Sequence, residues 1–125
     1  MMIQVYDPVY KNNLLVAIDE PTAAVVRCIE RQTKSKLADC DVDMLRIRGD
    51  ARSVAFSGGA RVMRLPRYKH TPYWYAILAH EAYHVATFLI DHVGIKRSEA
   101  SDEAVAYEVE FAVRKILEKV MRRRK

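Results

Sequence analysis

Apolar residues change their spacing along the chain, and these changes divide it into segments. From residue 21 to about residue 37 they recur every three or four positions, the pattern of a helix with one buried side. Residues 43–65 instead hold short apolar runs separated by turn sequences at 49–50 and 57–59. These runs predict a small sheet of three short antiparallel strands after an N-terminal helix.

Residues 1–18 fit two patterns. Ile3 and Val5 alternate with polar neighbours as in a short strand, whereas Asp7 followed by Pro8 is typical of a helix N-cap and a first-turn proline. The sequence leaves the structure of this segment open.

Two longer helices are predicted in the second half of the chain. Thr71 and Pro72 have the pattern of an N-cap and a first helical residue, and the apolar spacing continues for about twenty residues, up to a terminating Gly94. Ser101 is the expected N-cap of a last helix. A helix, three strands and two helices together predict a single α+β domain over residues 1–125.

The composition agrees with one folded domain. Half of the 125 residues are apolar and 30% are charged, which is enough for a core without disulfide bonds. The longest apolar run, residues 14–18, is far too short to cross a bilayer, and the first residues lack the pattern of a secretory leader. We therefore expect a cytoplasmic protein with no membrane segment, in which Cys28 and Cys40 are reduced thiols.

The net charge of +5 is concentrated at one end of the chain. Residues 114–125 carry seven basic side chains and one acidic side chain, so the 113 residues before them have a net charge of −1. A basic face for nucleic acid is therefore poorly supported. The basic tail, residues 122–125, is expected to be a solvated helix end.

The strongest functional signal lies within the first of the two longer helices, where His80, Glu81 and His84 form the pattern HExxH. Histidines four positions apart on a helix differ by about 40° in direction and 6 Å along its axis, so both imidazoles can bind one metal ion. Glu81 then lies close enough to take a proton from water bound to that ion. The motif predicts a Zn²⁺ site.

A catalytic zinc normally has a third protein ligand, and the HExxH helix does not supply one. Asp91 and His92 lie about 10 Å or more beyond His84 along the helix axis. Acidic residues near the start of the last helix are the candidates: Glu99, Asp102, Glu103, Glu108 and Glu110.

Spacing then relates the chain to a known family. Eighteen residues separate His84 from Glu103, and HExxH-x18-E resembles the gluzincin family of zinc metallopeptidases. The segment SVAFSGGARVMRL at 53–65, which precedes the HExxH helix, is similar to the strand, turn and edge strand before the active-site helix of zincins. The resemblance covers residues 43–113. It implies three zinc ligands and a general base: His80, His84 and Glu103, and Glu81.

Other features extend this resemblance. Tyr107 lies one turn after Glu103, so it is a candidate catalytic residue that donates a hydrogen bond to a ligand or to an oxyanion. Residues 61–65 are expected at a free sheet edge, which either binds an extended peptide or is guarded by Arg61 and Arg64. The short chain and its HEAYH and DEAVAY sequences also resemble small zincin-like proteins of phages and prophages.

We therefore expect a minimal zincin-like domain that hydrolyses peptide bonds in a protein or peptide substrate. The chain lacks the second domain that forms the other wall of the cleft in thermolysin-like enzymes, and it lacks the exopeptidase motif G-x-M-E-N. Two alternatives therefore stay open. One is a zincin-like binding module without activity, and the other is a small nucleic-acid-associated protein in which the motif is accidental.

Overall fold

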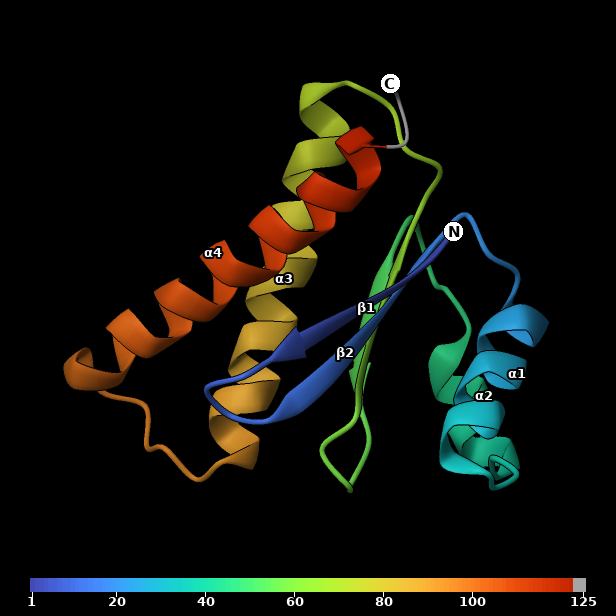
Figure 1. Ribbon diagram of the computed structural model, residues 1–125, viewed down its shortest axis with the longest axis horizontal. Helices are drawn as coiled ribbons and strands as arrows, with labels where there is room; N and C mark the ends of the chain where they lie inside the picture. Colours follow the sequence, from blue (N-terminus) through green and yellow to red (C-terminus); the bar gives the residue numbers. More distant parts are fainter. Residues whose placement is uncertain (123–125) are drawn as a thin grey trace.

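A computed structural model describes residues 1–122 as four strands and four helices. In chain order these elements are β1 (Met2–Asp7), β2 (Asn12–Ile18), α1 (Thr22–Thr33), α2 (Asp39–Leu45), β3 (Arg52–Ala55), β4 (Arg61–Leu65), α3 (Pro72–His92) and α4 (Glu99–Arg122). Figure 1 shows the sheet between two helical layers, with α1 and α2 on one face and α3 and α4 on the other. The α+β class is confirmed. Most of the basic tail, residues 123–125, lies outside the described residues.

The sheet differs from the predicted one in strand number and in orientation. Its order is β1-β2-β4-β3. The pairs β1 with β2 and β3 with β4 are antiparallel, whereas β2 runs parallel to β4. The prediction of three antiparallel strands is therefore wrong. Two of the four strands come from residues 1–18, where the sequence fitted two patterns.

The first strand predicted within residues 43–65 is instead part of α2. Asp39 and Asp41 lie in the first turn of this helix, where carboxylates favour the helix dipole, and Leu45 at its end is fully buried. A run of three or four apolar residues is too short for its period to separate a strand from a helix.

Strand β2 has helices on both of its faces, which explains its unbroken apolar run. Leu14, Val16 and Ile18 belong to the core cluster under α3 and α4. Leu15 and Ala17 belong to the cluster under α1. All five side chains are buried, and continuous apolar sequence is typical of a strand covered on both sides.

Strand β4 is an interior strand, so the prediction of a free edge at residues 61–65 is wrong. Arg61 and Arg64 are only 5% and 4% exposed, on opposite faces of the sheet. Arg61 Nη1 donates to the carbonyl oxygen of Val85 (2.9 Å), and Arg64 Nη1 donates to that of Leu45 (2.6 Å). Burial lowers the pKa of both guanidinium groups, although arginine stays charged at such sites. The edge strands are β1 and β3.

Helix α3 begins as predicted. Thr71 Oγ1 accepts a hydrogen bond from the backbone N–H of Trp74 (3.3 Å), and Pro72 is the first helical residue. Trp74 is buried, and its Nε1 donates to the carbonyl oxygen of Pro66 (3.1 Å). Gly94 follows the helix with a φ of +81°, a conformation that favours glycine.

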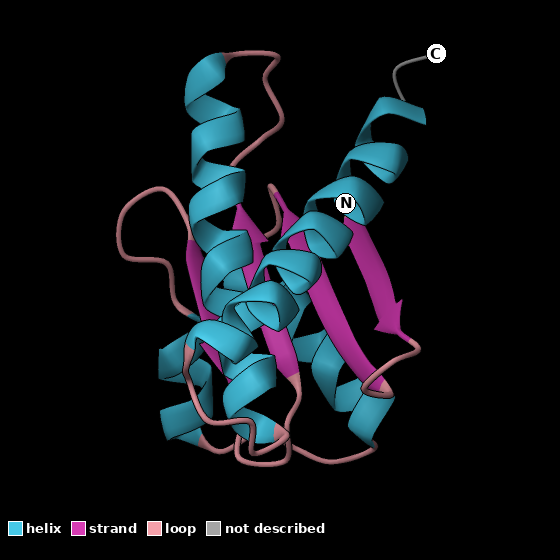
Figure 2. Ribbon diagram, turned by 90° about the vertical axis from the view of Figure 1, so that its left-hand side faces the viewer, coloured by secondary structure: helices cyan, strands magenta, loops and turns pink. Residues whose placement is uncertain are grey.

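Helix α4 begins at Glu99, two residues before the predicted N-cap. Ser101 lies within its first turn, where its hydroxyl accepts a hydrogen bond from the backbone N–H of Ser98 (2.7 Å). Figure 2 shows α4 crossing α3 obliquely in front of the sheet. Helix α3 packs on β3 and β4, and α4 reaches β1 at the other edge. Over residues 1–122, none of the helices combines the length and apolarity needed to span a bilayer.

Candidate metal centre

The HExxH residues lie in the middle of α3, where the helix packs on the sheet. Glu81 lies on its buried side, beside fully buried Ala82 and Val85. His80 is exposed and His84 is half-buried, on a neighbouring part of the helix surface. The motif therefore places two ring nitrogens at the surface and a carboxylate against the sheet.

The two histidines converge on one point. Their Nε2 atoms are 3.1 Å apart and their ring centroids are 4.8 Å apart. Two nitrogens bound to one tetrahedral zinc at about 2.0–2.1 Å lie about 3.3–3.4 Å apart, close to this spacing. Phe88 stacks on the ring of His84 with an angle of 22° between the planes, which limits the orientations of this imidazole. The pair fits two corners of a zinc site.

Glu81 is 6% exposed and has a hydroxyl partner on the edge strand. Ser53 Oγ on β3 donates to Glu81 Oε2 (2.5 Å). Glu81 also lines a hollow of about 260 Å³, together with His80. The other residues around this hollow are Asp50, Ala51, Tyr73, Ala76 and Ile77. The base candidate and one ligand candidate therefore share an open recess.

One side of this recess carries a tyrosine–aspartate pair. The hydroxyl of Tyr73 donates to Asp50 Oδ2, and this hydrogen bond raises the pKa of Tyr73. No sequence motif pointed to Asp50 or Ser53 as functional residues. Ser53 is detectable in the sequence only as a polar residue that alternates with apolar Val54 and Phe56.

The structure does not bring Glu103 to the histidines. Within residues 1–122 there is no group of three His, Cys, Asp or Glu side chains that could hold a metal ion. Val105 contacts Ala86 and Ile90 of α3, and Glu103 projects about 160° away from Val105 around α4. Glu103 is therefore exposed, on the side of α4 that faces away from α3.

The other candidates on α4 have separate environments. Tyr107 is 49% exposed and stacks on Phe111, with ring centroids 6.3 Å apart. Asp102 and Glu110 line a different recess with Tyr83, and Glu99 is exposed. Glu108 is buried, and Asp7 and Arg61 are the charged groups that act on it.

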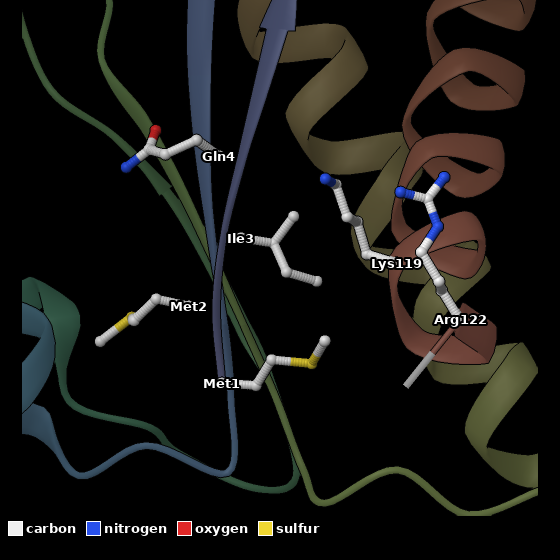
Figure 3. A pocket seen from close by; sticks show the side chains of 6 residues that line it. All are labelled: Met1, Met2, Ile3, Gln4, Lys119 and Arg122. Atoms are coloured by element: carbon white, nitrogen blue, oxygen red, sulfur yellow. The ribbon is translucent and has the colours of Figure 1, made fainter. Parts of the chain in front are cut away.

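A further hollow of about 400 Å³ lies at the opposite edge of the sheet (Figure 3). It is bounded by β1 and by Lys119 and Arg122, whose side chains extend from α4 toward β1 (Figure 3). It contains no residue of the HExxH motif. We therefore place the candidate chemistry at the smaller recess beside β3.

Comparisons with protein-family models, with curated proteins and with solved structures gave no match to this chain. The function of this chain is therefore inferred from its side chains.

Proposed function

We propose that this chain is a zinc-dependent metallopeptidase that hydrolyses peptide bonds in a protein or peptide substrate. His80 and His84 are the proposed metal ligands, and Glu81 is the proposed general base. The observation that carries this proposal is the convergence of the two Nε2 atoms to 3.1 Å beside a buried carboxylate. Imidazole nitrogens suit zinc better than magnesium or calcium, which prefer oxygen ligands.

The described residues fit two of the three protein ligands of a catalytic zinc. Glu103 remains the proposed third ligand, on the strength of the gluzincin-like spacing. Because Glu103 projects away from α3, this assignment requires the first turns of α4 to turn or shift when zinc binds. Tyr107 lies one turn further on the same exposed side and would move with it.

In the proposed reaction, zinc and Glu81 have separate roles. Zinc, when bound, polarises a carbonyl group and lowers the pKa of water. Glu81 takes the proton of the attacking water and passes it to the leaving amine. The recess beside His80 and Glu81 is open to solvent and gives a peptide access to this carboxylate.

Zinc affinity tests the proposal directly. We expect the protein to bind about one zinc ion per chain, and His84→Ala to weaken binding by at least about a hundredfold, because an imidazole ligand is lost. Competition with a chromogenic chelator measures both. His92→Ala is the matched control, since this exposed histidine lies on α3 but outside the motif. If the parent binds no zinc, or if His84→Ala binds it equally well, the proposal fails.

A binding module without hydrolytic activity is a second candidate function. Its support is that the structure gathers no third ligand within residues 1–122. Mass spectrometry of a proteome-derived peptide library, incubated with the zinc-loaded protein, separates the two functions. Cleavage products that disappear with Glu81→Gln support the peptidase, whereas zinc binding without any cleavage supports the module.

A further inference from the structure

Glu81 has two carboxylate oxygens in different surroundings, and one hydroxyl group creates the difference. The geometry points to Ser53 as the residue that positions Glu81, by holding Oε2 so that Oε1 faces the recess and accepts the proton from water. This inference rests on the proposed function for the role of Glu81. The hydrogen bond itself does not depend on zinc.

The strand register directs Ser53 toward α3. Ser53 pairs with Met63 across β3 and β4, and Met63 belongs to the core cluster beneath α3. Val54, the next residue, belongs to the cluster on the opposite face of the sheet. Because side chains alternate along a strand, Ser53 faces the helix that carries Glu81.

The Ser53 hydroxyl has one proton to donate, and the distances from Ser53 Oγ show which oxygen of Glu81 accepts it in a hydrogen bond. Ser53 Oγ lies 2.5 Å from Glu81 Oε2 but 3.4 Å from the carbonyl oxygen of Glu81. The side-chain contact is the stronger hydrogen bond. Oε1 is not among the buried oxygens that lack a partner in the described part of the chain, and Glu81 lines the recess. Oε1 is therefore the oxygen available to water.

A neutral donor suits this position. The ion pairs found within residues 1–122 do not include Glu81. Arg52, the neighbour of Ser53 on β3, directs Nη1 away to the carbonyl oxygen of Arg46 (2.9 Å). Ser53 thus fixes the orientation of the carboxylate without adding a positive charge that would compete for it.

The positioning role is tested by the orientation of the Glu81 carboxylate in the zinc-free, full-length protein. Crystal structures of the parent and the variants report this orientation directly. We expect one ordered carboxylate with Oε2 at Ser53 Oγ in the parent protein and more than one carboxylate orientation in Ser53→Ala. Ser53→Thr keeps the hydroxyl and should restore the parent orientation. Ser57→Ala, in the exposed turn after β3, is the matched control and should change nothing.

A single carboxylate orientation in Ser53→Ala, equal to that of the parent, would overturn the inference, whether or not zinc binds. With zinc bound and a peptide that the parent cleaves, Ser53→Ala should lower kcat by about ten- to a hundredfold with KM nearly unchanged. Zinc affinity should stay at the parent value. An unchanged kcat would also overturn the inference while leaving the proposed function intact. Several carboxylate orientations in Ser53→Ala, in a protein that binds no zinc, would confirm the positioning and remove the peptidase.

Discussion

Two glutamates lie buried near α3 and differ in what faces them. Glu81 is 6% exposed, and its carboxylate accepts a hydrogen bond from the hydroxyl of Ser53. Glu108 on α4 is 3% exposed and faces a second carboxylate, Asp7 at the end of β1. The two sites therefore differ in the group opposite the buried carboxylate, which is a neutral hydroxyl at Glu81 and a second acid at Glu108.

The second site is a closed cluster of Asp7, Arg61 and Glu108. Asp7 Oδ2 and Glu108 Oε1 are buried oxygens without a hydrogen-bond donor in the described part of the chain. Burial, and then the hydrogen bond and charge of Asp7, raise the pKa of Glu108 to about 8, although Arg61 acts in the opposite direction. A proton held by Glu108 supplies a donor between the two acids, and the charge of Arg61 opposes this rise in pKa.

Replacement of the Glu81 carboxylate, in the recess beside β3, should have the largest effect on activity. Glu81→Gln should lower the rate of peptide hydrolysis by about 10²–10⁴-fold, because the amide cannot accept the proton of water. Zinc affinity should be unchanged, since the ligands remain. Comparison of kcat/KM on a peptide cleaved by the parent measures the effect. A rate within a few fold of the parent would show that Glu81 is not the base.

Replacement of Arg61, the positively charged residue of the cluster with Asp7 and Glu108, should have the largest effect on stability. Arg61→Met removes the buried positive charge that faces Asp7 and Glu108, together with the hydrogen bond to Val85, so the free energy of unfolding should fall by about 3–5 kcal/mol. Urea denaturation measures it. Arg46→Met, at an exposed arginine paired with Asp43, is the control and should cost at most about 1 kcal/mol. Equal losses in the two variants would contradict a special role for the buried cluster.

A smaller effect, dependent on pH, should distinguish the two glutamates further. The pKa of Glu108 is about 8 in the folded protein, against an ordinary value of 4.5, so the folded state holds more protons than the unfolded state between these values. Its contribution to the free energy of unfolding should therefore fall as the pH rises from about 4.5 to 8, and then level off. Glu108→Gln lacks this proton, so its stability relative to the parent should increase over that window.

Urea denaturation at a series of pH values measures this difference. Glu110→Gln, at an exposed position on the same helix, is the control and should follow the parent curve. Asp7→Asn keeps the acceptor for the backbone N–H groups of Val9 and Tyr10 and supplies a donor toward Glu108, so it should reduce the pH dependence. A Glu108→Gln curve parallel to that of the parent would show that the pKa of Glu108 is not raised in the folded protein.

The local features of the chain were predictable from the sequence because they depend on neighbours three or four residues apart. Thr71 and Pro72 marked the start of α3, and Gly94 marked the end. The spacing of His80 and His84 allows two close ring nitrogens on one helix, and the structure places them 3.1 Å apart.

Pairings between distant segments were decided only by the tertiary structure. The order β1-β2-β4-β3 joins residues 1–18 to the rest of the sheet and makes β4 an interior strand, which buries Arg61 and Arg64. The apolar pattern of a strand does not show which other strands pair with its two edges, because this pairing depends on how helices cover both faces of the sheet. For the same reason, alternation alone could not identify Ser53 as the partner of Glu81.

The placement of α4 shows the same division between local and tertiary information. The sequence determined a helix with an apolar stripe through Val105, Ala112 and Ile116, but the tertiary structure decided which of its acids meet α3. The stripe packs against α3 and the sheet, so Glu103 projects to solvent while Glu108 is buried with Asp7. The geometry of residues 80–84 was predictable because it lies within about one helical turn. A third ligand and the raised pKa of Glu108 depend instead on how separate elements pack.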